Sequence, residues 1–204
     1  MKELFNKPKL IGIIADVNSG KSNLLYHIIE TLRQDSEFNL VTFGLKSKIP
    51  NSTQIFSLEE LEVVEDSLII LDEVFSLLDL DNRTKKKQIE QTLRLLHHRN
   101  NILILSLLPE NSKKFLASKF DMCIFKKCTI ADCINGSTVK RNITQYCGHE
   151  KGTTTLAMPI DKALIYDGAN YSTMHVPYYP KFDSKAGNRP IFKEKKKSIF
   201  KKTG

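Results

Sequence analysis

The stretch ADVNSGKS, from Ala15 to Ser22, constrains the fold of this chain more than any other segment. It fits the pattern [AG]-x4-G-K-[ST], with alanine where glycine usually stands. The apolar run KLIGII comes before it and reads as a buried strand. Apolar residues after it recur at helical spacing: Leu24, Leu25, Ile28, Ile29 and Leu32. A strand, this loop and a helix in that order predict a phosphate-binding loop; the alternative is a plain Gly-Lys-Ser turn.

The residue types in this loop suit a triphosphate. Gly20 lets backbone N–H groups curl around phosphate oxygens, Lys21 can reach the β- and γ-phosphates, and the Ser22 hydroxyl can ligate Mg²⁺. The helix that begins here adds the positive end of its dipole. We therefore predict ATP and Mg²⁺ as ligands. The predicted nucleotide-binding residues are Ala15, Asp16, Val17, Asn18, Ser19, Gly20, Lys21, Ser22 and Asn23.

A second motif lies in DSLIILDEVF, where Ser67–Leu71 reads as a buried strand followed by Asp72 and Glu73. An aspartate at the end of such a strand can hold Mg²⁺, and we predict that Asp72 does so together with Ser22. The next acid, Glu73, can orient and polarise the attacking water. An enzyme that only transfers phosphoryl to a bound acceptor does not need that glutamate. The alternative is a strand that ends in surface acids.

The remaining segments alternate between strand and helix patterns. We expect strands at 39–46, 54–58, 101–109 and 122–127, helices at 84–100 and 111–120, and a polar, acidic connector at 59–66. Further on we expect an interrupted helix at 129–145, short strands at 153–158 and 163–168, and an extended segment at 171–180. Alternation of this kind predicts an α/β fold, with a mostly parallel central sheet flanked by helices and a small C-terminal β or extended part.

Basic charge is concentrated at the C-terminal end. Residues 181–204 hold nine Lys or Arg against two acids, so most of the net charge of +8 lies there. Phe182, Phe192 and Phe200 stand among these lysines. Basic residues interleaved with aromatic ones suit a nucleic-acid backbone and stacking on bases. The alternatives are a solvated tail that aids solubility and a tail that binds an anionic membrane surface.

The length of 204 residues fits one domain with a small appendage. We predict a nucleotide-binding core at 1–128, a C-terminal extension packed on it at 129–180, and the basic tail at 181–204. No apolar run approaches the ~20 residues that cross a bilayer, and the N-terminal segment lacks a signal-peptide core. We therefore expect a cytoplasmic protein without a membrane span.

Four cysteines, Cys123, Cys128, Cys133 and Cys147, lie close together in the sequence but form no C-x2-C pair. Their spacing, with or without His149, matches no standard zinc site, and disulfides are rare in the cytoplasm. We expect reduced structural thiols rather than a metal centre.

These motifs together resemble the additional-strand, catalytic-Glu branch of the P-loop NTPases. The resemblance rests on the phosphate loop, on the strand ending in Asp72-Glu73, and on the helix LRLLHHRN before the strand ILILSLL. Within this branch the chain resembles the FtsK/HerA-type ATPases, especially the small genome-packaging ATPases of viruses, over residues 9–128. That implies a RecA/FtsK-like sheet in which the 101–108 strand lies between the two motif strands.

The resemblance also implies an activity and partners. The family's usual activity is ATP-driven translocation of double-stranded DNA by a homo-oligomeric ring, a pentamer or a hexamer. For a viral packaging ATPase, a capsid portal or vertex protein becomes a further partner, and the host cytoplasm becomes the location.

The resemblance assigns further site residues. Ser106 would read the γ-phosphate, and an arginine from a neighbouring subunit, Arg99 or Arg94, would stabilise the transition state. Both arginines can equally be surface helix residues. Two departures stand out: packaging ATPases often carry an arginine at 16–19, where this chain has DVNS, and a glutamine after the central strand, where this chain has LSLLPEN. Asn111 is an alternative to Ser106 as the sensor.

Two other functions stay open at this point. A small-molecule kinase is disfavoured by Glu73 and by the lack of an arginine-rich lid. A nucleotide-dependent module that binds DNA or another partner without hydrolysis is disfavoured by the intact Lys21, Asp72 and Glu73.

Overall fold

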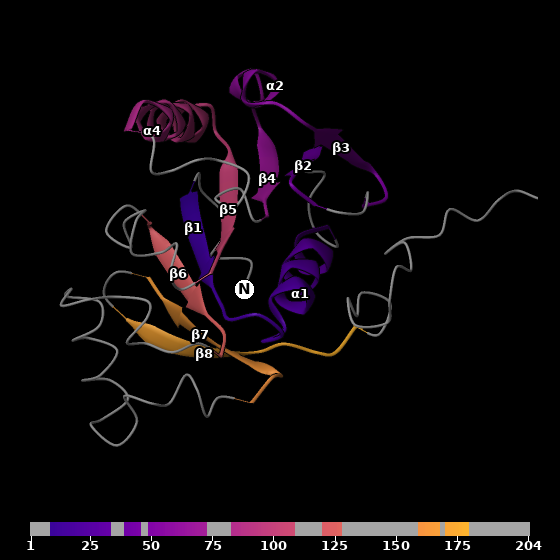
Figure 1. Ribbon diagram of the computed structural model, residues 1–204. Coiled ribbons are helices and arrows are strands. Elements are labelled where there is room, and N and C mark those ends of the chain that lie inside the picture. The colour runs from indigo at the N-terminus through magenta and orange to yellow at the C-terminus, as the bar shows by residue number, and fades with distance from the viewer. Residues whose placement is uncertain are drawn as a thin grey trace, which may run out of the picture.

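The computed structural model describes residues 9–33, 39–45, 49–72, 83–108, 120–127, 159–167 and 170–179. Over these ranges the chain forms an eight-stranded sheet with helices on both faces (Figure 1). The strands are β1 (Lys9–Ile14), β2 (Asn39–Phe43), β3 (Ser52–Ile55), β4 (Ser67–Leu71), β5 (Ile102–Leu107), β6 (Met122–Phe125), β7 (Lys162–Tyr166) and β8 (Tyr171–His175). The helices are α1 (Lys21–Arg33), α2 (Leu58–Glu62) and α4 (Arg83–His98).

The strand order is β3-β2-β4-β5-β1-β6-β7-β8. All pairs from β3 to β6 are parallel, and only β7 and β8 are antiparallel to their neighbours. The predicted fold class, an α/β fold with a mostly parallel sheet, is confirmed. β5 lies between β1 and β4, as the resemblance implied: Ser106 stands beside Ile13, and Leu105 beside Leu71. The carboxyl ends of these three strands therefore meet at one edge of the sheet.

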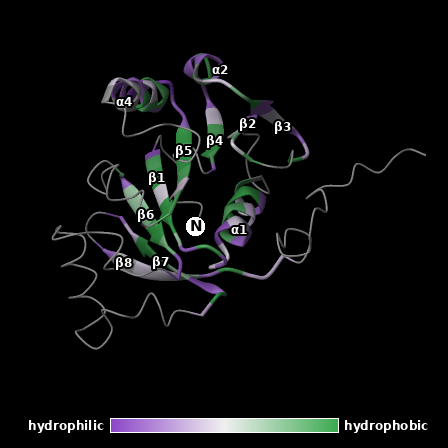
Figure 2. Cartoon of the chain, in the orientation of Figure 1, coloured by the Kyte–Doolittle hydropathy of each residue, from purple (hydrophilic) through white to green (hydrophobic). Residues whose placement is uncertain are grey.

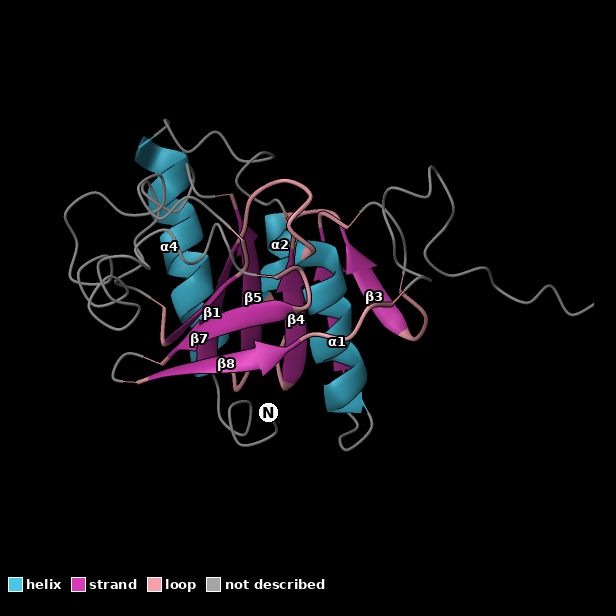
Figure 3. Cartoon of the chain, turned by 90° about the horizontal axis from the view of Figure 1, so that it is seen from below, coloured by secondary structure: helices cyan, strands magenta, loops and turns pink. Residues whose placement is uncertain are grey.

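Side chains alternate between the two faces of the sheet, and each face is covered by helix. On one face α1 buries the apolar residues that its sequence spacing predicted. On the other face lie α4, through Ile89, Leu93 and Leu96, and α2, through Leu61. Figures 1 and 3 show α1 on the opposite side of the sheet from α2 and α4, and Figure 2 shows the central strands as mostly hydrophobic. A sheet buried on both faces explains the nearly continuous apolar runs of its strands.

The segment 59–66, expected to be a polar, acidic connector, begins within the short helix α2. Ser57 caps this helix, because its hydroxyl accepts a hydrogen bond from the amide of Glu60 at 3.2 Å. The Glu60 carboxylate in turn accepts one from the amide of Phe56 at 2.7 Å. This arrangement resembles a capping box, except that the carboxylate binds the amide of the residue before the cap and not that of the cap itself. The short strand expected at 54–58 lies at Ser52–Ile55.

The strand expected at 163–168 is β7, and the segment expected to be extended at 171–180 contains β8; the two form a hairpin that extends the sheet beyond β6. The predicted helix at 129–145 and strand at 153–158 lie outside the described residues, as do nearly all of the helix at 111–120, the catalytic candidate Glu73 and the basic tail. The division into core, extension and tail stays a prediction. In the described part of the chain, no helix has the length and apolar character that spanning a membrane requires.

Candidate nucleotide-binding site

The loop between β1 and α1 is fixed at its start by the neighbouring strands. The amide of Ala15 donates to the carbonyl of Leu107 at 3.2 Å, and the amide of Asp16 donates to that of Lys127 at 3.1 Å. Ser19 closes the loop on itself, because its hydroxyl donates to the Asp16 carbonyl at 2.7 Å. The loop therefore has a fixed starting point at the edge where β5, β1 and β6 end.

Gly20 has a backbone conformation that favours glycine. Its φ of +86° lies in the left-handed region, and Asn18 also has a positive φ, of 61°. A Cβ on Gly20 would lie 3.2 Å from Cγ1 of Ile160 and 3.4 Å from Cε of Lys126. The amides of the first helical turn, which follow Gly20, have no acceptor within a helix and suit an anion. The geometry thus fits the phosphate groups of a nucleotide.

Three polar side chains converge beside this loop. The ammonium of Lys21, in α1, lies 3.8 Å from Oδ1 of Asp72, which follows β4. The hydroxyl of Ser106, on β5, donates a hydrogen bond to the same carboxylate oxygen. Side chains of Lys21 and Asp72 are only 11% and 16% exposed. A distance of 3.8 Å is longer than a hydrogen bond, so a phosphate oxygen can become the closer partner of Lys21.

Asp72 and Ser22 offer oxygen atoms, the ligand type that Mg²⁺ prefers. Ser22 follows Lys21 in the first turn of α1, and both Asp72 and Ser22 are partly buried. These residues therefore fit the predicted metal site. The contact between Ser106 and Asp72 gives Ser106 an orienting role toward this carboxylate, and its predicted contact with the γ-phosphate stays a prediction.

Tyr26 is a further residue at the site that sequence reasoning missed. It lies one helical turn after Ser22 and is buried. Burial, and secondarily the negative charge of Asp72, raises the pKa of its phenol well above the usual value, so the ring stays neutral. Its spacing of four residues from Ser22 on a helix was the available signal, but a tyrosine at such a position also suits an ordinary core.

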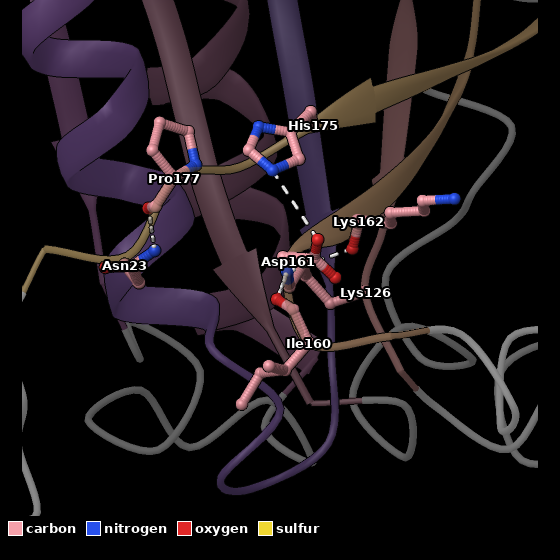
Figure 4. A network of polar contacts seen from close by, with 7 residues as sticks. All are labelled: Asn23, Lys126, Ile160, Asp161, Lys162, His175 and Pro177. Carbon is pink, nitrogen blue, oxygen red and sulfur yellow. Dashed lines mark hydrogen bonds and ion pairs between the residues drawn. The ribbon is translucent and has the colours of Figure 1, made fainter.

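Asn23, predicted to bind nucleotide, has its side chain engaged elsewhere (Figure 4). Its Nδ2 donates to the carbonyl of Pro177 at 2.6 Å, and its Oδ1 accepts from the amide of Tyr179 at 2.8 Å. Tyr179 also places its hydroxyl 3.0 Å from Nδ1 of His27. The segment after β8 is therefore fastened along the first turns of α1.

Arg94 and Arg99 are not brought to this site. Both are exposed, Arg94 on α4 and Arg99 in the turn between α4 and β5. Arg99 precedes β5, whereas Asp72 follows the parallel neighbour β4, so the two lie at opposite edges of the sheet. A six-residue strand such as β5 spans about 20 Å. Arg99 therefore lies far from the phosphate loop of the same chain.

Solved structures share this arrangement of strands and helices. The DNA-packaging ATPase B204 of Sulfolobus turreted icosahedral virus matches with a TM-score of 0.56 and 17% identity over 85% of this chain and 100% of that one. The genome-packaging NTPase B204 of Sulfolobus turreted icosahedral virus 2, in complex with AMPPCP, matches with a TM-score of 0.54, 17% identity and the same coverage. The chain therefore shares its fold with these packaging NTPases.

The monomer form of TcpA, the conjugation coupling protein of pCW3, with ATPγS, has the same fold. Its TM-score is 0.59 at 14% identity, over 91% of this chain and 64% of that one. No protein-family model and no curated sequence matches the chain. The resemblance drawn from the motifs is thus confirmed at the level of the fold.

Proposed function

We propose that this chain is an ATPase whose ring oligomer moves double-stranded DNA, and that this movement packages a viral genome into a capsid. The observation that carries the proposal is the convergence of Lys21, Asp72 and Ser106 at the phosphate loop, with β5 between β1 and β4. Support for DNA as the substrate comes from the basic tail and from the fold shared with a genome-packaging NTPase and a conjugation coupling protein. The site of action is the host cytoplasm, with a capsid portal or vertex protein as partner.

In this proposal the chain's own residues divide the work. The loop amides and Lys21 bind the β- and γ-phosphates, and Ser22 and Asp72 hold Mg²⁺, which neutralises phosphate charge when bound. Ser106 holds the Asp72 carboxylate in one orientation through its hydroxyl. Glu73 follows Asp72 directly in the sequence and orients the attacking water. Water, and not a second substrate, is the phosphoryl acceptor.

DNA stimulation tests the function as a whole. We expect linear double-stranded DNA to increase steady-state ATP hydrolysis several-fold, in samples whose mass corresponds to a ring. The measurement is ATPase activity with and without DNA beside native mass determination. Phosphoryl transfer to a small acceptor without DNA stimulation would instead identify a kinase. Nucleotide binding with negligible hydrolysis, with DNA and oligomer present, would identify a binding module.

A variant without the basic tail tests whether the tail binds the DNA. Cutting the chain after Pro190 removes six lysines: Lys193, Lys195, Lys196, Lys197, Lys201 and Lys202. Each true phosphate contact adds about 0.9 to the slope of log affinity against log salt, so we expect the slope to fall by roughly two to four. Basal hydrolysis should be unchanged, because the loop and Asp72 lie outside the tail. An unchanged slope would assign DNA binding to another surface.

Arg99 is proposed to act on the nucleotide of a neighbouring subunit, because it is exposed and lies far from its own loop. Arg99→Ala should bind ATP normally and hydrolyse it about 10³-fold or more slowly, the usual effect of removing an arginine finger. Mixing it with Lys21→Ala subunits, which keep Arg99, should restore part of the activity at mixed interfaces. Arg94→Ala, on α4, tests the other arginine candidate in the same way. A fully active monomer at all protein concentrations would rule this role out.

A further inference from the structure

Lys126 is a buried lysine that the proposed mechanism does not use. It directly follows β6, and its relative exposure is 0%. Its ammonium donates to two backbone carbonyls, those of Ile160 and Lys162, the latter at 2.9 Å. Both carbonyls belong to the turn and first residue of β7, so the side chain ties the end of β6 to the β7–β8 hairpin (Figure 4).

The same residue contacts the phosphate loop. Its amide donates to the carbonyl of Ile14, the last residue of β1, at 3.0 Å. A Cβ added to Gly20 would lie 3.4 Å from Cε of Lys126 and 3.2 Å from Cγ1 of Ile160, so both side chains lie next to Gly20. Lys126 and Ile160, whose carbonyl Lys126 binds, therefore form the wall behind Gly20.

The hairpin is fastened to the loop region at a second point. Asp161 accepts a hydrogen bond at its carbonyl from the amide of Val176 at 2.6 Å, which joins the turn before β7 to the end of β8. From there the chain continues to Pro177, where Asn23 of α1 is bound. The hairpin thus holds the phosphate loop on both sides, at Gly20 through Lys126 and at the first turn of α1 through Asn23.

We propose that Lys126 is a positioning residue for the triphosphate: its buried ammonium fixes the wall behind Gly20 and adds a second positive charge, besides Lys21, at the phosphate loop. A cation held in a poorly solvated place attracts phosphate charge more strongly than one in water. The inference rests on the proposed function, since it concerns the nucleotide that the site binds.

The charge of Lys126 can be tested by its titration. Burial lowers the pKa of Lys126 to about 8, against the opposing effect of the Asp161 carboxylate. Asp161 in turn lies 3.5 Å from Nε2 of His175 on β8. Lys162, whose backbone carbonyl binds Lys126, has an exposed side chain at the start of β7. The ammonium is therefore mostly present at pH 7 and mostly lost at pH 9.

The expected result is a triphosphate affinity that falls above pH 8. Bound phosphate raises the pKa of Lys126, so a non-hydrolysable ATP analogue should bind the wild-type chain about fivefold more weakly at pH 9 than at pH 7. Lys126→Arg, which stays protonated throughout, should remove most of this pH dependence. Lys126→Met should bind the analogue about tenfold more weakly at pH 7. Calorimetric titration measures the affinity of all three proteins for the analogue.

The control is Lys162→Met, because only the backbone carbonyl of Lys162 binds Lys126 and its side chain is exposed. It should bind the analogue like the wild type. If Lys126→Met does not fold, the comparison of wild type and Lys126→Arg across pH still decides. Equal pH dependence in wild type and Lys126→Arg, or full affinity in a folded Lys126→Met, overturns the inference. A wild-type chain that binds no triphosphate overturns the proposed function instead.

Discussion

Lys21→Ala should lose nucleotide binding. A charge-assisted hydrogen bond to a phosphate contributes about 2 to 3 kcal/mol, so we expect the dissociation constant of an ATP analogue to rise by a factor of about 30 to 150. The loss is expected to be this large because Lys21 now balances the Asp72 carboxylate at 3.8 Å. Without the ammonium, Asp72 repels the incoming triphosphate. Hydrolysis should fall below detection at ordinary ATP concentrations.

Lys127→Ala is the matched control for this variant. Lys127 also lies at the loop, but it is exposed and contributes its backbone carbonyl to the amide of Asp16. Its side chain should therefore be dispensable for binding. Isothermal titration of both variants beside the wild type checks the prediction. Normal affinity in Lys21→Ala would show that the loop does not bind phosphate in the way its sequence predicts.

Glu73→Gln should separate binding from hydrolysis. The amide keeps the size of the side chain and cannot polarise water as a carboxylate does, so we expect kcat to fall about 10²- to 10⁴-fold. Binding of ATP should stay close to that of the wild type, because Lys21, Ser22 and Asp72 are unchanged. Steady-state hydrolysis and equilibrium binding, measured on the same preparation, test the expected loss of kcat and the expected unchanged affinity.

Glu65→Gln serves as the control for Glu73→Gln. Glu65 is exposed and precedes β4, so it lies at the opposite edge of the sheet from Asp72. Its backbone carbonyl accepts a hydrogen bond from the hydroxyl of Ser67 at 2.7 Å. The variant should hydrolyse ATP at the wild-type rate. A wild-type rate in Glu73→Gln as well would remove the catalytic assignment and reopen the kinase and binding-module readings.

The sequence predicted the elements that carry a strong periodic pattern or a motif. The β1–loop–α1 unit, β4 and the place of β5 follow from short apolar runs, helical spacing and the resemblance. The capping residue Ser57 and the glutamate three residues after it are visible in the sequence, but the acidic composition of the segment favoured a connector over a helix. Here a local hydrogen-bond pattern decided the structure, and composition did not.

The contacts at the site were less predictable, because they depend on strand register and on backbone partners. The hydrogen bond from Ser106 to Asp72 requires β5 to lie beside β4 with Leu105 opposite Leu71. Lys126 binds carbonyls that follow it by 34 and 36 residues, and a carbonyl leaves no mark in the sequence. A lysine after a buried strand also reads as an ordinary surface residue. Only the arrangement in space makes it part of the site.

The fastening of residues 176–179 along α1 decides where the C-terminal end of the chain is anchored. Tyr179, the last described residue before the basic tail, is joined to Asn23 and His27, one and two turns into the helix that begins at the phosphate loop. A force applied to the chain after Tyr179 would therefore act on α1, the helix that carries Lys21 and Ser22, and not on the far edge strand β3 of the sheet.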